Sequence, residues 1–146
     1  MINLTKKKLQ TTLEEAENSL LNGDRFGFTF DRKWSSNFPD VSGLYAIFDN
    51  GTLIYIGESA NVKERMKELK RTINHTFRRK LCFKLFGKHP IVKSKYPEEI
   101  ETALNDFYLS NISVSAIEMN FGRLETETYL INKYKDHSIL NSIGKR

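Results

Sequence analysis

Apolar residues recur along this chain at two different spacings, which predicts a domain of mixed helices and strands. Between Leu9 and Leu20 they return every three or four residues, and Thr5 and Gly23 supply a start and a stop signal for a helix. The same helical spacing, together with capping residues, predicts further helices after Ser59 or Asn61, over 76–86, after Pro97 and over 122–135.

Stretches rich in β-branched and aromatic residues predict the strands. Segments 43–48 and 52–56 flank Asp49-Asn50-Gly51, a strong hairpin signal, and the segment 112–118 alternates apolar residues with serines. Alternating phenylalanines over 26–30 predict a short strand or an extended segment. We therefore expect an α+β fold in which a small three-stranded, mainly antiparallel sheet is flanked by helices, with an extra N-terminal helix.

The turn of the hairpin decides whether Tyr45 and Tyr55 face the same side of the sheet, because successive strand residues point to opposite faces. A three-residue loop with Gly51 in the left-handed conformation places Tyr45 directly opposite Tyr55. A two-residue loop of Asn50 and Gly51 places the two tyrosines on opposite faces instead. The sequence is compatible with both registers, and only the first gives a shared tyrosine surface.

The composition fits a single folded domain. The 146 residues are 39% hydrophobic and 28% charged, which excludes a disordered or fibrous protein. The longest apolar runs, such as 53–56, are far too short to cross a membrane. Residues 1–10 show no secretory signal and Cys82 is the single cysteine, so we expect a cytoplasmic protein in which Cys82 is a small buried residue.

Basic residues are concentrated in one part of the chain. The net charge is +5, and residues 62–95 carry 12 Lys and Arg against 2 Asp and Glu, whereas 1–61 carry 6 against 8 and 96–146 carry 5 against 8. Such a basic segment is typical of proteins that bind the phosphates of nucleic acid. The alternatives are a solvated helical face, or a surface that binds anionic membrane or another protein.

Two charged residues are expected to point inward from predicted helices. In the last helix Glu127 shares a face with Leu130 and Ile131, whereas Glu125 lies on a more polar face. In the helix after the hairpin, Arg65 lies on the apolar side. Because a buried carboxylate needs a metal, a hydrogen bond or an ion pair, Glu127 is either a functional residue or the partner of Arg65 in a buried ion pair.

Five separated elements occur in the order of a known enzyme family. They are Gly43-Leu44-Tyr45, Tyr55-Ile56-Gly57, Arg65 ten residues after the second tyrosine, Glu127 and Asn141. In this order they resemble the GIY-YIG endonuclease superfamily, with leucine in place of the isoleucine of the first motif and no proline between Glu127 and Asn141. The resemblance implies a small three-stranded sheet with flanking helices and a metal-dependent enzyme that cuts nucleic acid, usually DNA.

The resemblance also implies roles for these residues. Glu127 would hold one Mg²⁺ or Mn²⁺ ion, and Arg65 would bind the scissile phosphate and offset the charge of the transition state. Tyr45 would orient or deprotonate the attacking water, for which a neighbouring cation must lower its pKa. Tyr55 would line the same cleft, and Asn141 would brace the site through hydrogen bonds.

His75 lies in the basic segment and is a further candidate. It would assist proton transfer or contact a phosphate, or else it would cap a helix or lie on the surface. We group it with Gly57 and Asn141 as a supporting residue. Seven basic residues are expected to bind the DNA backbone without reading its bases: Lys63, Lys67, Lys70, Arg71, Arg78, Arg79 and Lys80.

These features together predict an endodeoxyribonuclease. Residues 43–146 would form the nuclease domain, and residues 1–42 would pack on it as a helical and extended extension or would make a dimer contact. The expected partner is double-stranded or branched DNA, with no membrane, and a homodimer or a partner protein is left open. The alternative is a catalytically silent nucleic-acid-binding module on the same scaffold.

Overall fold

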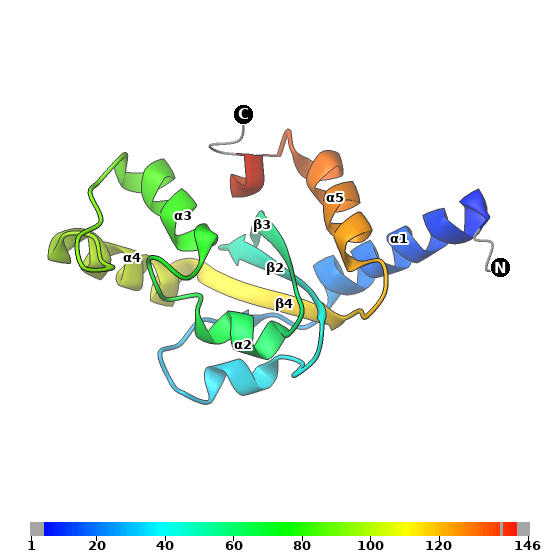
Figure 1. The fold of residues 1–146 in the computed structure, drawn as a ribbon, viewed down its shortest axis with the longest axis horizontal. Helices are drawn as coiled ribbons and strands as arrows, with labels where there is room; N and C mark the ends of the chain where they lie inside the picture. Colours follow the sequence, from blue (N-terminus) through cyan, green and yellow to red (C-terminus); the bar gives the residue numbers. More distant parts are fainter. Residues whose placement is uncertain (1–4, 138, 143–146) are drawn as a thin grey trace.

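The computed structural model describes residues 5–137 and 139–142. None of the helices in this part of the chain is long and apolar enough to span a membrane, and Cys82 is buried as expected. The elements (Figure 1) are α1 (Lys6–Asn22), β1 (Phe26–Gly27), the 3-10 helix η1 (Trp34–Asn37), β2 (Gly43–Asp49), β3 (Thr52–Ser59), α2 (Val62–Lys67), α3 (Thr76–Phe86), α4 (Glu98–Asn111), β4 (Ile112–Glu118), α5 (Arg123–Tyr134) and the 3-10 helix η2 (Leu140–Ser142).

Several helices begin at residues that the sequence marks as caps. The Thr5 hydroxyl accepts a hydrogen bond from the Lys8 amide at 3.1 Å, which starts α1. Of the two cap candidates for α2, Asn61 is the one used, because its side-chain oxygen accepts the Glu64 amide at 2.9 Å. Pro97 precedes the first turn of α4. Thr5 and Asn61 each accept a hydrogen bond from an amide that has no partner within its own helix. Pro97 has no amide hydrogen that would need a partner.

The sheet is antiparallel and has four strands in the order β1-β4-β2-β3, one more than the three predicted. The additional strand is β1, where Phe26 pairs with Val114. Beyond it, the Phe28 amide donates to the Ile112 carbonyl at 2.8 Å, and the buried Phe28 ring packs on Trp34. Burial of this aromatic segment fixes the short strand against the edge of β4.

Side chains of the central strand β2 alternate between two hydrophobic cores. Leu44 and Phe48 belong to one core, together with Leu20 of α1 and Leu130 of α5. The intervening Tyr45 belongs to the other core, which is formed with α2, α3 and α4. Figure 1 shows α1 and α5 together on one side of the molecule and α3 and α4 on the other. The strand that carries Tyr45 is therefore covered on both faces.

The hairpin between β2 and β3 contains a β-bulge that the sequence did not reveal. Asn50 and Gly51 both have positive φ, 48° and 86°, and form a two-residue loop. Next to the turn, Phe48 pairs with Leu53, as this loop requires. The next pair is Ile47 with Tyr55, so Ile54 is an extra residue and the register shifts by one from there on. Neither predicted register is therefore right along the whole hairpin. The shift returns Tyr45 and Tyr55 to the same face of the sheet.

Candidate active site

Tyr45 of β2 and Tyr55 of β3 lie side by side on one face of the sheet. Tyr55 pairs with Ile47, two residues along β2 from Tyr45. The two tyrosine rings are stacked, with centroids 6.2 Å apart and an interplanar angle of 28°. Phe77 of α3 packs edge-on against Tyr55 at 5.3 Å, and all three side chains are buried. The two rings therefore form one fixed wall.

The glycines of both tyrosine motifs are required by close packing. Gly57 pairs with Tyr45, and a Cβ atom at position 57 would lie 2.2 Å from the Tyr45 Cζ and 2.3 Å from its hydroxyl oxygen. A Cβ atom at Gly43 would lie 2.0 Å from the carbonyl oxygen of Ile117 on β4. Any larger residue at 57 must displace the Tyr45 ring, so Gly57 sets the position of the hydroxyl.

His75 connects Tyr45 to the start of α3. Its side chain is fully buried, its Nδ1 accepts a hydrogen bond from the Phe77 amide at 3.2 Å, and its Nε2 lies 3.1 Å from the Tyr45 hydroxyl. His75 thus caps the helix and also contacts the tyrosine. Because a neutral imidazole whose Nδ1 accepts a hydrogen bond carries its proton on Nε2, His75 donates to the Tyr45 oxygen.

Burial and nearby charges set the protonation of these groups. Burial lowers the pKa of His75 to about 3, and the positive charges of Arg65 and Arg79 act in the same direction. Burial raises the pKa of Tyr45 and of Tyr55, and Arg65 acts in the opposite direction on both hydroxyls. In the protein alone, both tyrosines keep their protons at neutral pH. The lowered Tyr45 pKa that base catalysis requires is not a property of the protein by itself.

Arg65 is held at the end of α2, beside the tyrosines. Its Nη1 donates to the Asn74 carbonyl at 2.8 Å and lies 3.5 Å from the Glu68 carboxylate. The side chain is 27% exposed, so the guanidinium is accessible to a ligand. Its charge acts on the pKa of both Tyr45 and Tyr55, which indicates that it lies close to the two hydroxyls.

Glu127 of α5 brings a carboxylate to the same tyrosines. It is partly buried whereas Glu125 is exposed, so the helical periodicity distinguishes the two carboxylates correctly. The negative charge of Glu127 raises the pKa of Tyr45 and of Tyr55, so the carboxylate lies within electrostatic reach of both hydroxyls. Figure 1 shows β3 between α3 and α5. His75 caps the start of α3, and Glu127 lies on α5.

Asn141 of η2 braces the outer strand of the sheet. Its Oδ1 accepts the Ile56 amide at 2.9 Å, and its Nδ2 donates to the Ile56 carbonyl at 2.6 Å. Ile56 lies between Tyr55 and Gly57, so these two bonds hold the second motif and satisfy backbone groups at the sheet edge. The Lys80 amine donates to the Asn141 carbonyl at 2.9 Å, which ties α3 to η2.

Arg78 does not reach the surface, and its predicted contact with DNA is wrong. The side chain is 0% exposed. Its Nη2 donates to the Glu101 carboxylate at 2.8 Å and to the Asn105 side chain at 2.9 Å, and its Nε donates to the Thr72 hydroxyl at 3.2 Å. The guanidinium also lies over the Tyr108 ring, 5.1 Å from its centroid. Arg78 therefore joins α3 to α4.

The remaining predicted DNA-binding residues differ in exposure, and one of them supports the site. Arg79 donates to the carbonyls of Thr72 at 3.1 Å and Ile73 at 2.6 Å, and its charge acts on Tyr55 and His75. This role was not predicted, although Arg79 follows His75 by four residues and so shares its side of α3. Lys67, Lys70 and Arg71 are exposed, and Lys63, Arg79 and Lys80 are partly buried.

The site offers a donor set suited to a hard cation that keeps most of its water. Within residues 5–137 and 139–142, no three His, Cys, Asp or Glu side chains form a group that could hold a metal ion. Mg²⁺ often binds through one or two carboxylates, with water and substrate phosphate as its other ligands. Glu127 fits that pattern. A guanidinium, a carboxylate and a tyrosine hydroxyl whose charges act on one another suit the chemistry of phosphate esters.

The comparison with protein families agrees with this geometry. Residues 41–141 match the model of the GIY-YIG catalytic domain. No curated protein and no solved structure matches the chain. The matched range covers more than half of the sequence and contains Tyr45, Tyr55, Arg65, Glu127 and Asn141. The chain therefore belongs to the GIY-YIG family.

Proposed function

We propose that this protein is a divalent-metal-dependent endonuclease that hydrolyses the phosphodiester bonds of DNA. The GIY-YIG family consists generally of endonucleases. The observation that carries the proposal is the buried Tyr45 hydroxyl, which is bonded to His75 at 3.1 Å and on which the charges of both Arg65 and Glu127 act. These groups come from four different elements or their caps.

Arg65 binds the scissile phosphate in this proposal. Its guanidinium is partly exposed and has donors beyond the one that it gives to Asn74. Glu127 holds one Mg²⁺ or Mn²⁺ ion, because a carboxylate is the ligand that such hard cations prefer. When bound, the ion supplies positive charge that stabilises the leaving oxygen. Arg65 adds a second fixed positive charge as negative charge builds up on the phosphate.

Tyr45 orients the attacking water. Because the Nε2 of His75 donates to the Tyr45 oxygen, the tyrosine proton points elsewhere and is available for a hydrogen bond to water. The same bond from His75 stabilises negative charge on that oxygen when the proton leaves. Arg65 lowers the pKa of Tyr45 against the larger effect of burial, and a cation held by Glu127 adds to this effect.

The substrate in this proposal is double-stranded or branched DNA. The basic residues around the site contact the phosphate backbone, and such contacts position a protein without carrying sequence information. We therefore expect weak sequence specificity, and cleavage at one short defined sequence would contradict this expectation. The residues concerned are Lys63, Lys67, Lys70, Arg71, Arg79 and Lys80.

Cleavage of supercoiled and branched DNA tests the proposal, with Glu127→Gln as the variant. Glu125→Gln is the matched control, because Glu125 is an exposed carboxylate on the same helix. We expect wild type and Glu125→Gln to nick DNA with Mg²⁺ or Mn²⁺ and to stop when EDTA is added. Glu127→Gln should bind DNA without cutting it.

Two results would contradict the proposal. The first is cleavage by Glu127→Gln at the wild-type rate, which would show that the carboxylate takes no part in the mechanism. The second is wild-type protein that binds DNA in a salt-sensitive way and cleaves no substrate, which would support the silent binding module instead.

A further inference from the structure

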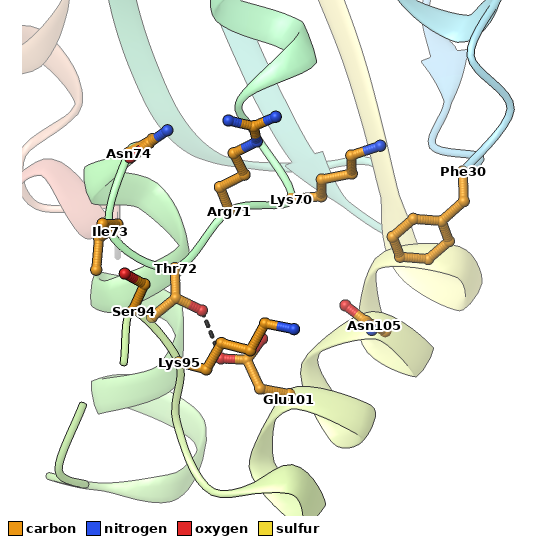
Figure 2. Close-up of a pocket in the computed structure, with 10 residues that line it drawn as sticks. All are labelled: Phe30, Lys70, Arg71, Thr72, Ile73, Asn74, Ser94, Lys95, Glu101 and Asn105. Carbon is orange, nitrogen blue, oxygen red and sulfur yellow. Dashed lines mark hydrogen bonds between the residues drawn. The ribbon is translucent and has the colours of Figure 1, made fainter. Parts of the chain in front are cut away.

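A hollow lies beside the residues of the proposed active site, and two of the basic residues expected to contact the DNA backbone, Lys70 and Arg71, line it. It has a volume of about 580 Å³ and is bounded by residues 70–74, by Ser94 and Lys95, and by α4, with Phe30 at one side (Figure 2). Hollows of this size accommodate ligands as large as a nucleotide. Phe30 precedes the range 41–141 that matches the family, so this hollow combines the family domain with the N-terminal part of the chain.

Three positive charges line this hollow without a partner. The side chains of Lys70, Arg71 and Lys95 form no hydrogen bond or ion pair with any residue that the structure describes. The carboxylate in the wall, Glu101, is already neutralised by the buried Arg78 at 2.8 Å. The hollow therefore has a net positive charge, which favours a ligand that carries phosphates.

Phe30 offers an aromatic ring to the same space. Its side chain is 38% exposed, and its ring packs edge-on against the buried Phe28 with centroids 4.9 Å apart. Figure 2 shows Lys70 extending toward Phe30, and Lys95 extending across the hollow toward Asn105. A fixed and accessible aromatic ring beside free cations is the combination with which proteins bind unpaired nucleotides, by stacking the base and pairing the phosphate.

The hollow and the catalytic residues share one wall. Thr72, Ile73 and Asn74 line the hollow. Arg79 donates to the carbonyls of Thr72 and Ile73, and Arg65 donates to the carbonyl of Asn74. Arg65, whose charge acts on both tyrosines, and Arg79, whose charge acts on Tyr55, therefore also hold this wall. A strand whose phosphate lies at Arg65 has a short path past the wall into the hollow.

A second, smaller hollow adjoins the first. It has a volume of about 380 Å³ and shares Lys70 and Arg71 with the first hollow. Arg32 and Lys67 add two more cations to its wall, and Asp31 adds one carboxylate. Lys67 is paired with Glu64 at 2.9 Å, and the buried Trp34 also lines the hollow. We call the two hollows together the basic groove.

We propose that the basic groove binds an unpaired segment of the substrate strand next to the cleavage site, with a base stacked on Phe30 and phosphates bound by Lys70, Arg71 and Lys95. This inference rests on the proposed nuclease function and specifies its substrate. DNA that has a single-stranded arm beside the cleavage site would be bound more tightly than an intact duplex.

Fluorescence anisotropy of the full chain with a labelled oligothymidylate of roughly 12 nucleotides, in EDTA, tests the inference without requiring cleavage. Phe30→Ala should weaken binding roughly 5- to 160-fold, the range that the loss of one base stack gives, and Phe30→Tyr should restore it. Lys95→Gln should reduce the slope of log affinity against log salt by about 0.7. A blunt duplex of the same length should bind Phe30→Ala as it binds wild type.

The matched controls are Phe121→Ala and Lys7→Gln, which remove an exposed aromatic and an exposed cation outside the groove. Both should bind the oligonucleotide like wild type. An equal loss in Phe121→Ala and Phe30→Ala would overturn the inference. So would a loss on the duplex as large as the loss on the single strand, because the groove would then be a general backbone contact.

The two proposals fail in different ways. If wild type cleaves DNA and Phe30→Ala binds the oligonucleotide as tightly as wild type does, the groove assignment is wrong and the nuclease function stands. If oligonucleotide binding depends on Phe30 but wild type cleaves no substrate with any divalent metal, the nuclease function is wrong and the groove binds single strands for another purpose.

Discussion

Acidification should destabilise this protein through His75. The folded protein requires the neutral imidazole, because Nδ1 accepts the Phe77 amide and the ring is fully buried. A protonated ring would carry a hydrogen on Nδ1 and would lose that helix cap. The unfolded chain has no such restriction and takes up a proton near the ordinary pKa of 6.5, whereas the folded pKa is about 3. The contribution of His75 to stability is therefore complete above pH 6.5 and falls as the pH falls toward 3.

The size of the effect follows from the two pKa values. Between pH 7.5 and pH 5 the unfolded state becomes almost fully protonated at His75, while the folded state stays neutral. Linkage then gives a loss of about 2 kcal/mol in the free energy of unfolding. With a urea dependence of about 1–3 kcal/mol per molar, the unfolding midpoint should move down by about 1 M.

Urea unfolding of wild type and His75→Gln at pH 7.5 and pH 5 measures this loss. The single tryptophan, Trp34, is buried and reports unfolding by its fluorescence. His75→Gln should be less stable than wild type at pH 7.5, and the gap should shrink by about 2 kcal/mol at pH 5. The pKa values of Glu17 and Glu101 are lowered, so these carboxylates cost stability only below pH 4.5 and affect both proteins alike.

His137→Gln serves as the matched control, since His137 is exposed and its replacement should leave the pH dependence of wild type unchanged. The reasoning would be refuted by parallel pH profiles for wild type and His75→Gln. It would also be refuted if His137→Gln removed the same pH dependence, because the proton uptake would then belong to a surface group.

Three further substitutions test individual contacts, each by urea unfolding at pH 7.5. Gly57→Ala should cost about 1–3 kcal/mol and reduce DNA cleavage, because the new methyl group would displace the Tyr45 ring; unchanged cleavage would contradict this placement. Asn141→Ala should cost about 1–3 kcal/mol by leaving two backbone groups of β3 without partners, and a loss near zero would mean that water replaces the amide. Arg78→Met should cost about 3–5 kcal/mol because Glu101 loses its buried partner, and full stability would show that the pair is not needed.

The helices could be predicted from the sequence because their boundaries depend on local side chains. Asn61 caps α2 through a neighbour three residues away, and α3 occupies the predicted range 76–86. The choice between Glu125 and Glu127 follows the helical period alone, and the structure agrees that Glu127 is the less exposed carboxylate. Each of these predictions uses contacts within about one helical turn, which sequence spacing encodes directly.

The strand register could not be predicted from the turn alone. The two-residue loop without a bulge would place Ile56 opposite Tyr45, and the three-residue loop would place Tyr55 there. The structure instead places Gly57 opposite Tyr45, where a Cβ atom would lie 2.2 Å from the ring. The shift at Ile54 therefore brings the glycine to the position that the tyrosine ring needs. This requirement arises from side-chain volume across the sheet, which turn residues do not encode.

Arg78 and Arg79 show a second limit of sequence reasoning. They are neighbours in one basic segment and look equivalent in the sequence. The structure buries Arg78 against Glu101 of α4 and leaves the charge of Arg79 acting on Tyr55 and His75. Their difference depends on a partner more than twenty residues away, so a charge count over the segment could not reveal it. A buried arginine needs such a partner, and the partner is fixed only when the helices pack.

The contact between His75 and Tyr45 links the stability of the fold to the preparation of the site. Burial raises the pKa of Tyr45 and so opposes its use as a base. The Nε2 hydrogen of neutral His75 points at the tyrosine oxygen, where it would stabilise a negative charge. Nε2 carries this hydrogen only while Nδ1 accepts a hydrogen bond from the Phe77 amide. The helix cap that favours the folded state thus also fixes the proton that faces Tyr45. Replacing His75 by Asn, which can keep the cap but cannot reach the hydroxyl, should therefore slow cleavage while retaining more stability in urea unfolding than His75→Gln does.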